Sequence, residues 1–231
     1  MKPAVHRVVD VAKTTEKMTT QNVPVIFASV QHFLQACEKE ISNIPQERNE
    51  LLKTLALHIQ QQLAKESTIS LTFICTHNSR RSHFAQIWAQ VAAAYYGLQN
   101  IVCYSGGTEV TAFNLNAVKA LQTAGLIITG ASAESNTHYS VQYSAVHPAI
   151  EAFSKKYADA PNPSSDYTAV LTCSEADEAC PVVFGANARF KITFEDPKKS
   201  DGTPEQDAVY LNRCKQIATE MLYVFQLVSI N

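Results

Sequence analysis

Apolar and polar residues follow two kinds of pattern along this chain. Short apolar runs rich in β-branched residues are typical of buried strands, whereas apolar residues repeated every three or four positions predict helices with one buried face. The short runs are TISLTFIC at 68–75, NIVCYSGG at 100–107, YTAVLTC at 167–173 and ARFKITF at 188–194. We therefore expect four strands, with room for helices between them.

Helical spacing fills most of the intervals between these runs. It covers residues 82–96, where Gly97 ends it, and residues 114–123, which begin with asparagines suited to capping a helix. A capping box with a proline at the first helical position predicts a last helix over about 203–227. Strands alternating with helices indicate an α/β fold with an open, mainly parallel sheet flanked by helices.

The two ends of the chain differ in pattern, which predicts three parts. Residues 1–22 are polar and without periodicity, so we expect a loose tail. Residues 23–67 carry two amphipathic patterns and predict an N-terminal helical hairpin, and residues 68–231 predict the α/β domain. Within that domain, the segment 132–166 is rich in Ser, Asn, Tyr and Pro, and we expect only a short helical piece around 149–157.

Composition narrows the class of protein. The chain has 231 residues, of which 46% are hydrophobic and 17% charged, as is ordinary for globular proteins. Its 19 Lys and Arg against 21 Asp and Glu give a net charge of −2, and without a basic stripe we expect no nucleic-acid partner. No apolar run is long enough for a membrane span or a secretory signal, so we expect no membrane partner and a cytoplasmic location.

The six cysteines refine this picture. In a reducing compartment a close pair of cysteines is more often catalytic or metal-binding than a structural disulfide. We interpret three of the six, Cys37, Cys103 and Cys214, as small packing residues.

The stretch FICTHNSRRS, residues 73–82, carries the main chemical signal. The backbone N–H groups of residues 76–81 lie between a strand and a helix, where they can surround one anion together with the positive end of the helix. Cys75 at the base of such a loop is favoured as a thiolate nucleophile. Arg81 can bind two oxygens of a tetrahedral anion, Ser82 can donate to the Cys75 sulfur, and Asn78 tolerates left-handed backbone angles.

This stretch resembles the active-site loop of the low-molecular-weight phosphotyrosine phosphatase fold. The form Cys-Thr-x-Asn-Ser-x-Arg-Ser is especially similar to the thioredoxin-coupled arsenate reductase branch, and the similarity runs from about Ile69 to Phe225. The resemblance implies that Cys75 is the nucleophile and Arg81 the oxyanion binder. It also implies an oxyanion-binding role for the rest of the loop, formed by Thr76, His77, Asn78, Ser79, Arg80 and Ser82.

Two positions of the loop depart from the family pattern. His77 stands where the family usually has glycine, which could strain the loop or alter the anion that it binds. Arg80 stands where the family often has a second cysteine, and we expect it to point to solvent or to the rim of the loop.

A second motif, FEDPKKSDG, follows the last predicted strand. In the family such an Asp-Pro segment carries the acid that protonates the leaving oxygen, so the resemblance implies that Asp196 is a general acid. From the residues alone, Asp-Pro is also an ordinary turn signal.

The third motif, LTCSEADEACP, places Cys173 at a strand end and Cys180 seven residues later. A closed zinc site needs four ligands and no second pair of ligands is present, so we expect no metal. In thioredoxin-coupled arsenate reductases a similar pair performs a redox relay. The resemblance thus implies no bound cofactor and an external thioredoxin-like reductant. We interpret the acidic residues between the cysteines, Glu175, Asp177 and Glu178, as a solvated face.

Three functions remain open at this point. The first is the reduction of arsenate to arsenite through a three-cysteine relay. The second is a protein-tyrosine phosphatase that hydrolyses phosphate monoesters through a cysteinyl-phosphate, since Cys75, Arg81 and Asp196 serve both reactions. The third is a non-enzymatic regulator that binds an oxyanion or arsenite. The expected ligand is therefore a small oxyanion, arsenate or phosphate, or a phosphorylated substrate. Of the residues after the loop, we expect His83 at the surface and Trp88 in the core.

Overall fold

The computed structural model describes residues 26–66, 68–130, 135–179 and 182–229. The predicted tail therefore lies outside the described residues, and so does Cys180. Among the helices that are described, none combines the length and the apolar character needed to cross a bilayer.

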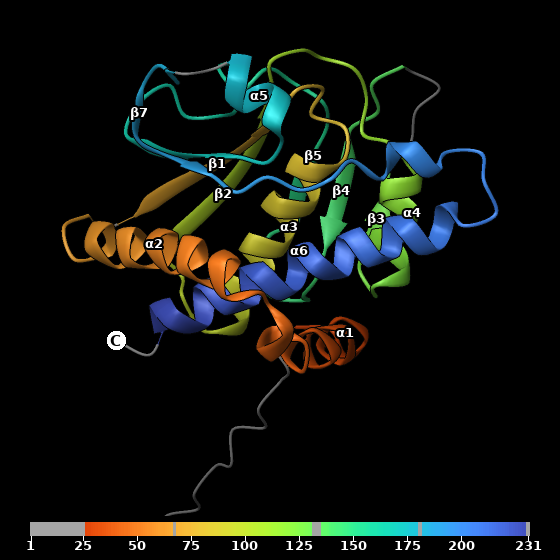
Figure 1. The fold of residues 1–231 in the computed structure, drawn as a ribbon, viewed down its shortest axis with the longest axis horizontal. Helices are drawn as coiled ribbons and strands as arrows, with labels where there is room; N and C mark the ends of the chain where they lie inside the picture. The colour runs from red at the N-terminus through yellow and green to blue at the C-terminus, as the bar shows by residue number, and fades with distance from the viewer. Residues whose placement is uncertain (1–25, 67, 131–134, 180–181, 230–231) are drawn as a thin grey trace, which may run out of the picture.

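A four-stranded parallel sheet forms the centre of the molecule, in the order β2-β1-β6-β7 (Figure 1). All four predicted strands are confirmed, with small shifts at their ends. β1 and β6 are almost entirely buried, in keeping with their β-branched composition. The strands are β1 (Ile69–Cys75), β2 (Ile101–Gly107), β6 (Tyr167–Leu171) and β7 (Ala186–Lys191).

The helices predicted after the strands are confirmed as well. α3 (Arg81–Tyr95) packs on β1 and β2, and Gly97, which follows it, has a φ of +75°. The side chain of Asn114 caps α4 (Leu115–Thr123). α6 (Gln206–Ser229) begins three residues later than the predicted cap at Thr203, because the preceding residues form turns. Two short elements flank the sheet end, α5 (Ser174–Ala179) and the 3-10 helix η2 (Pro197–Ser200).

Two helices precede the sheet, as predicted: α1 (Ala28–Glu38) and α2 (Gln46–Leu63), joined by the 3-10 turn η1 (Ile41–Asn43). Each of them packs on α6 rather than mainly along the other, and Figure 1 shows α2 running beside α6. The apolar sides of α1, α2, α3 and α6 belong to one buried cluster, so the N-terminal helices share the core of the α/β domain.

The segment predicted to hold a helical piece around 149–157 has another structure. It contributes to a small antiparallel sheet of β3 (Ile127–Thr129), β4 (Tyr139–Gln142) and β5 (Ile150–Ala152). The prediction of a helix was wrong because the apolar residues there pair as strands: Ile150 and Ala152 lie opposite Val141 and Tyr139. Local spacing over so few residues does not distinguish the two structures.

Two predictions about side chains were also wrong. His83 lies in the core, because the first turn of α3 is buried: its ring stacks on Phe113 at 4.0 Å between ring centroids, and its Nδ1 lies 3.2 Å from the hydroxyl of Ser105 in β2. Asp177 is not part of a solvated face, since its carboxylate pairs with Arg189 and Lys191 of β7. Trp88, Cys37, Cys103 and Cys214 are buried as predicted.

Candidate active site

Cys75 ends β1 at a point where the connections of the sheet run in opposite directions. β1 lies between β2, which follows it in the chain, and β6, which comes much later. Such a switch point leaves a crevice beyond the carboxyl ends of the two strands. The loop 76–80 occupies this crevice and leads directly into α3, so the sulfur of Cys75 faces the N-terminal end of a helix.

The carbonyl oxygens of this loop point outward. Four of them accept hydrogen bonds at 2.8 to 3.2 Å from Thr108, Glu109, Ser154 and Asn114. Because the C=O and N–H groups of a trans peptide point in opposite directions, the amides that follow these carbonyls face the inside of the loop. The four carbonyls belong to Cys75, Thr76, His77 and Ser79.

The Cys75 thiol is held by a short chain of polar groups. Its sulfur lies 3.1 Å from the hydroxyl of Ser82, which also accepts a hydrogen bond from the side-chain amide of Asn78 at 2.9 Å. Asn78 has a φ of +43°, the left-handed conformation expected of it, and its side-chain oxygen accepts from the backbone N–H of Lys155 at 2.9 Å. The structure therefore brings together three of the predicted residues, Cys75, Asn78 and Ser82.

Asp196 faces the same loop from the other side. Nη2 of Arg81 donates to one carboxylate oxygen at 2.9 Å, and Nε of Arg80 donates to the other at 2.8 Å. The carbonyl oxygen of Phe194 holds Nη1 of Arg81 at 3.1 Å. Both arginines are buried and the Asp196 side chain is 22% exposed, so the carboxylate and the two guanidinium groups form a largely buried cluster at the mouth of the loop.

The charge state of Asp196 follows from these contacts. Burial by itself favours the neutral acid, but Arg81, the N–H of Lys198 and Arg80 outweigh it and lower the pKa of Asp196 below its usual value. Asp196 is therefore a carboxylate at neutral pH in this arrangement. A group that protonates a leaving oxygen has to gain a proton first, and the charges of Arg81 and Arg80 oppose this at Asp196.

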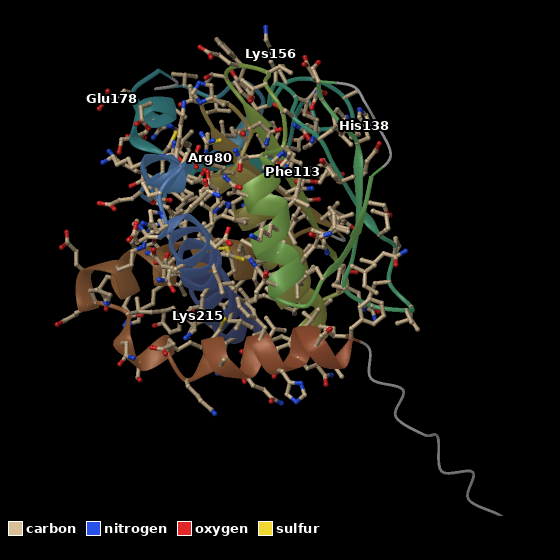
Figure 2. The ribbon with its side chains drawn as sticks, turned by 90° about the vertical axis from the view of Figure 1, so that its right-hand side faces the viewer. Arg80, Phe113, His138, Lys156, Glu178 and Lys215 are labelled. Carbon is tan, nitrogen blue, oxygen red and sulfur yellow. The ribbon has the colours of Figure 1, made fainter. Side chains whose placement is uncertain are left out.

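Of the two places expected for Arg80, solvent or the rim of the loop, the structure shows the rim: Arg80 pairs with Asp196 and lines the cleft beside the loop. Its side chain is buried, and in the view of Figure 2 its label lies within the outline of the molecule, whereas those of Glu178 and Lys156 lie near the edge. The reason is the ion pair with Asp196, whose two oxygens lie 2.8 and 3.4 Å from Nε and Nη2. The two adjacent arginines of the sequence thus share one carboxylate.

Cys173 lies beside the loop, two residues beyond β6. Its sulfur is 3.4 Å from the hydroxyl of Thr76 and accepts from the backbone N–H of Ala176 at 3.3 Å. Cys173 and Cys75 belong to the same small buried cluster. Burial raises the pKa of the Cys173 thiol, and the hydrogen bonds from Thr76 and Ala176 and the charge of Arg81 only partly oppose this. Both cysteines are reduced in the structure.

Of the remaining loop residues, Thr76, His77 and Ser79 all accept hydrogen bonds through their backbone carbonyls, and Thr76 also contacts Cys173 through its hydroxyl. The side chain of His77 is partly exposed, with Nε2 3.6 Å from a carboxylate oxygen of Glu109. No group of three or more potential metal-binding side chains occurs among the described residues.

Lys155 is a polar residue near the loop that the sequence did not single out. Its side chain is almost completely buried, and its ammonium donates to the carbonyl of Phe153 at 3.3 Å and lies over the Phe153 ring. Burial lowers the pKa of Lys155 to about 8. The backbone N–H of Lys155 donates to the side-chain oxygen of Asn78, so this buried residue is bonded directly to the loop. The residues next to Lys155 in the sequence form no motif that predicts its burial. Its place after a strand-like segment is the one signal that could have indicated a position near the loop.

A cleft of about 670 Å³ opens next to the loop. Its wall includes polar and cationic side chains from the loop and the acid segment, and aromatic side chains from two other segments. These include His77, Arg80, Lys198, Phe113 and Tyr139.

Fold and loop together define a class: a parallel α/β protein in which a loop from cysteine to arginine spans the switch point of the sheet. Comparison with known proteins identifies the family. A family model described as low molecular weight phosphotyrosine protein phosphatase matches residues 70–146. An arsenate reductase of Bacillus licheniformis is 28% identical over 159 residues, covering 68% of this chain and 94% of the relative. An arsenate reductase of Bacillus cereus is 30% identical over 132 residues, covering 57% of this chain and 79% of the relative.

The similar solved structures have lower sequence identity to this chain. A YwlE mutant from Bacillus subtilis is 15% identical with a TM-score of 0.47, covering 69% of this chain and 97% of that chain. A thioredoxin-dependent arsenate reductase of Corynebacterium glutamicum is 13% identical with a TM-score of 0.36, covering 81% and 92%. The chain belongs to the low-molecular-weight phosphotyrosine phosphatase superfamily, and within it is similar to arsenate reductases.

Proposed function

We propose that the protein reduces arsenate to arsenite, with a thioredoxin-like protein of the cytoplasm as the external reductant. The observation that carries this proposal is the second thiol at the loop. The sulfur of Cys173 contacts Thr76, the residue next to Cys75. Hydrolysis of a phosphate ester uses one thiol, an arginine and an acid, and gives no reason for a second buried cysteine here. The arsenate reductases among the relatives support the same reaction.

The first step is binding of the anion and attack by Cys75. Arsenate inside the loop accepts hydrogen bonds from the inward-facing amides and from Arg81. To bind arsenate, Arg81 gives up its ion pair with Asp196. The negative charge of the anion favours protonation of the released Asp196. The sulfur of Cys75 then forms a bond to arsenic, and a hydroxyl group of the singly or doubly protonated arsenate takes the proton of Asp196 and leaves as water, which breaks its bond to arsenic.

The second step is the reduction itself. The Cys173 thiolate attacks the Cys75 sulfur, a disulfide forms, and the sulfur–arsenic bond breaks with its electron pair remaining on arsenic. Arsenic is thereby reduced from the +5 to the +3 state, while two thiols are oxidised to one disulfide. Since burial raises the pKa of Cys173, we expect this thiol to ionise only when the anion and Arg81 have rearranged.

The third step regenerates the site. Cys180 lies seven residues after Cys173, outside the described residues. We propose that it attacks Cys173, takes over the disulfide and presents it to the reductant, as the resemblance to the reductase branch implies. All electrons then come from the external thiol protein, and no bound cofactor is needed.

A phosphatase is the second candidate, and the cleft beside the loop favours it. Arsenate fills only a small part of about 670 Å³, whereas the organic group of a phosphate monoester could lie against Phe113 and Tyr139. In that reaction water, rather than Cys173, would attack the Cys75 adduct.

One experiment separates these candidates. Arsenate-dependent NADPH oxidation is measured with thioredoxin and its reductase, for the wild type, Cys173→Ser and Cys180→Ser, and hydrolysis of an aryl phosphate is measured in parallel. The reductase proposal expects both serine variants to lose NADPH oxidation. Aryl-phosphate hydrolysis with no arsenate turnover in the wild type would favour the phosphatase.

A further inference from the structure

The N-terminal helices reach the candidate active site through one side chain, that of Arg48 in the first turn of α2. This residue lies on the side of α2 that faces α6, and its side chain is largely buried, with 18% of its surface exposed. The one other lysine or arginine of α2, Lys53, is at the surface, where it pairs with the exposed Glu50. Arg48 is therefore placed differently from an ordinary surface arginine.

The first partner of Arg48 fixes its guanidinium group. Nε and Nη2 lie 2.9 and 2.7 Å from one carboxylate oxygen of Glu220 in α6, and the Glu220 side chain is only 4% exposed. The other oxygen of Glu220 accepts from the side-chain amide of Gln216 at 3.0 Å. A charge pair held in this way has little freedom to move relative to α6.

The second partner of Arg48 belongs to the acid segment. The guanidinium carbon lies over the ring of Phe194, 4.8 Å from its centroid, and Phe194 is itself buried. The carbonyl oxygen of Phe194 accepts from Nη1 of Arg81, and Asp196 follows two residues later. One residue thus connects the Arg48 guanidinium with both the arginine and the acid of the candidate site.

We propose that Arg48 is a positioning residue, through which α2 sets the place of the segment 194–196 and so the alignment of Asp196 with the loop. The proposal rests on the function proposed above for Arg81 and Asp196. It assigns to the N-terminal helices a part in the reaction, in addition to the apolar surface that they cover. Arg48 touches neither the loop nor the anion site, so it acts through Phe194.

The test is a double-mutant cycle on arsenate turnover with the full chain. Arg48→Met removes the guanidinium, and it is combined with Glu220→Gln so that no buried charge loses its partner. Because displacements of about 1 Å near a reacting group can cost up to about 100-fold in rate, we expect kcat to fall about tenfold with KM for arsenate unchanged. In an Asp196→Asn background the same change should lower kcat less than twofold, since its effect passes through the acid.

Two further variants make the result decisive. Lys53→Met removes a cation from the same helix at the surface and should leave kcat and KM unchanged. Arg48→Lys keeps a cation beside Glu220, so it replaces the double variant if that variant does not fold. We expect a smaller decrease in kcat for Arg48→Lys, and only when Asp196 is present. Equal losses of kcat in both backgrounds, or no loss in either, would overturn the proposal. If the wild type does not reduce arsenate, the proposed function is wrong, but the role of Arg48 can still be tested. The same cycle is then run on aryl-phosphate hydrolysis, which needs the same acid.

Discussion

Arg81 binds Asp196 directly, with 2.9 Å between Nη2 and a carboxylate oxygen. In this arrangement the proposed oxyanion binder and the proposed acid neutralise each other. In the proposed mechanism an anion in the loop competes with Asp196 for the same guanidinium group. Binding of substrate and release of Asp196 from Arg81 are then one exchange of partners.

This exchange predicts a pH dependence for turnover. The acid has to be protonated in the complex, so kcat should fall as the pH rises through the pKa that Asp196 has beside the bound anion. Asp196→Asn should lower kcat by about 10² to 10⁴-fold and abolish this high-pH decline. Steady-state arsenate turnover between pH 5 and about 9 checks both. A decline that persists unchanged in the asparagine variant would assign it to another group.

The same ion pair predicts a pH dependence of stability. The pKa of Asp196 is lowered on folding, so its contribution is present above the usual value of 3.8 and is lost as the pH falls through the folded pKa. At pH 7 we expect Asp196→Asn to lower the free energy of unfolding by about 1–3 kcal/mol, because two buried arginines lose their partner. Denaturant unfolding should show this difference shrinking below pH 3.8.

A surface ion pair provides the control for this stability measurement. Asp207 pairs with Lys119, and both side chains are more than half exposed. Asp207→Asn should change stability little at either pH. A difference for Asp196→Asn that is the same at pH 7 and about pH 3 would contradict the account.

Arg80 predicts a separate effect, because it binds the acid but is not the proposed oxyanion clamp. Arg80→Met should raise the pKa of Asp196, moving the high-pH decline of kcat upward by about half to one pH unit, which corresponds to about 1 kcal/mol. KM for arsenate should change little. Arg81→Lys is the matched comparison: it keeps the charge but loses two-point binding, so kcat/KM should fall by about 100-fold or more. The same loss in both variants would refute separate roles.

Gly107, the last residue of β2, packs closely against the backbone of the loop, which leads to a prediction about its replacement. A Cβ atom at this position would lie 2.7 Å from the carbonyl oxygen of Thr76 and 2.8 Å from the backbone nitrogen of Asn78. Gly107→Ala should therefore displace the loop, weaken anion binding at least tenfold and destabilise the fold by about 1–3 kcal/mol. Equilibrium binding of phosphate and thermal unfolding measure the two effects. Binding and stability equal to wild type would show that the loop adapts.

Much of this arrangement is predictable from the sequence because it depends on local pattern. Apolar runs locate the four strands of the main sheet, and the loop after Cys75 follows from its place between strand and helix. The left-handed angle at Asn78 and its contact with Ser82 are consequences of the same few residues. The catalytic roles and the division into three domains remain predictions.

The features that the sequence did not predict depend on residues far apart in the chain. Arg80 and Asp196 are separated by 116 residues, and neither position indicates that the other will neutralise it. Lys155 follows β5 of the small second sheet, and its backbone N–H binds Asn78 of the loop; the residues of β5 were predicted as a helical piece. Arg48 contacts Phe194 only because α2 packs on α6.

The central claim is that Cys173 supplies the second thiol for reduction, and a single turnover tests it most directly. Fully reduced protein is mixed with excess arsenate in the absence of any external thiol, and arsenite, free thiols and disulfide-linked peptides are measured. We predict one arsenite per chain, the loss of two thiols, a disulfide that contains Cys173, and no arsenite from Cys173→Ser. Arsenite formed by Cys173→Ser in the same amount as by the wild type, or no arsenite from the wild type, would contradict the account.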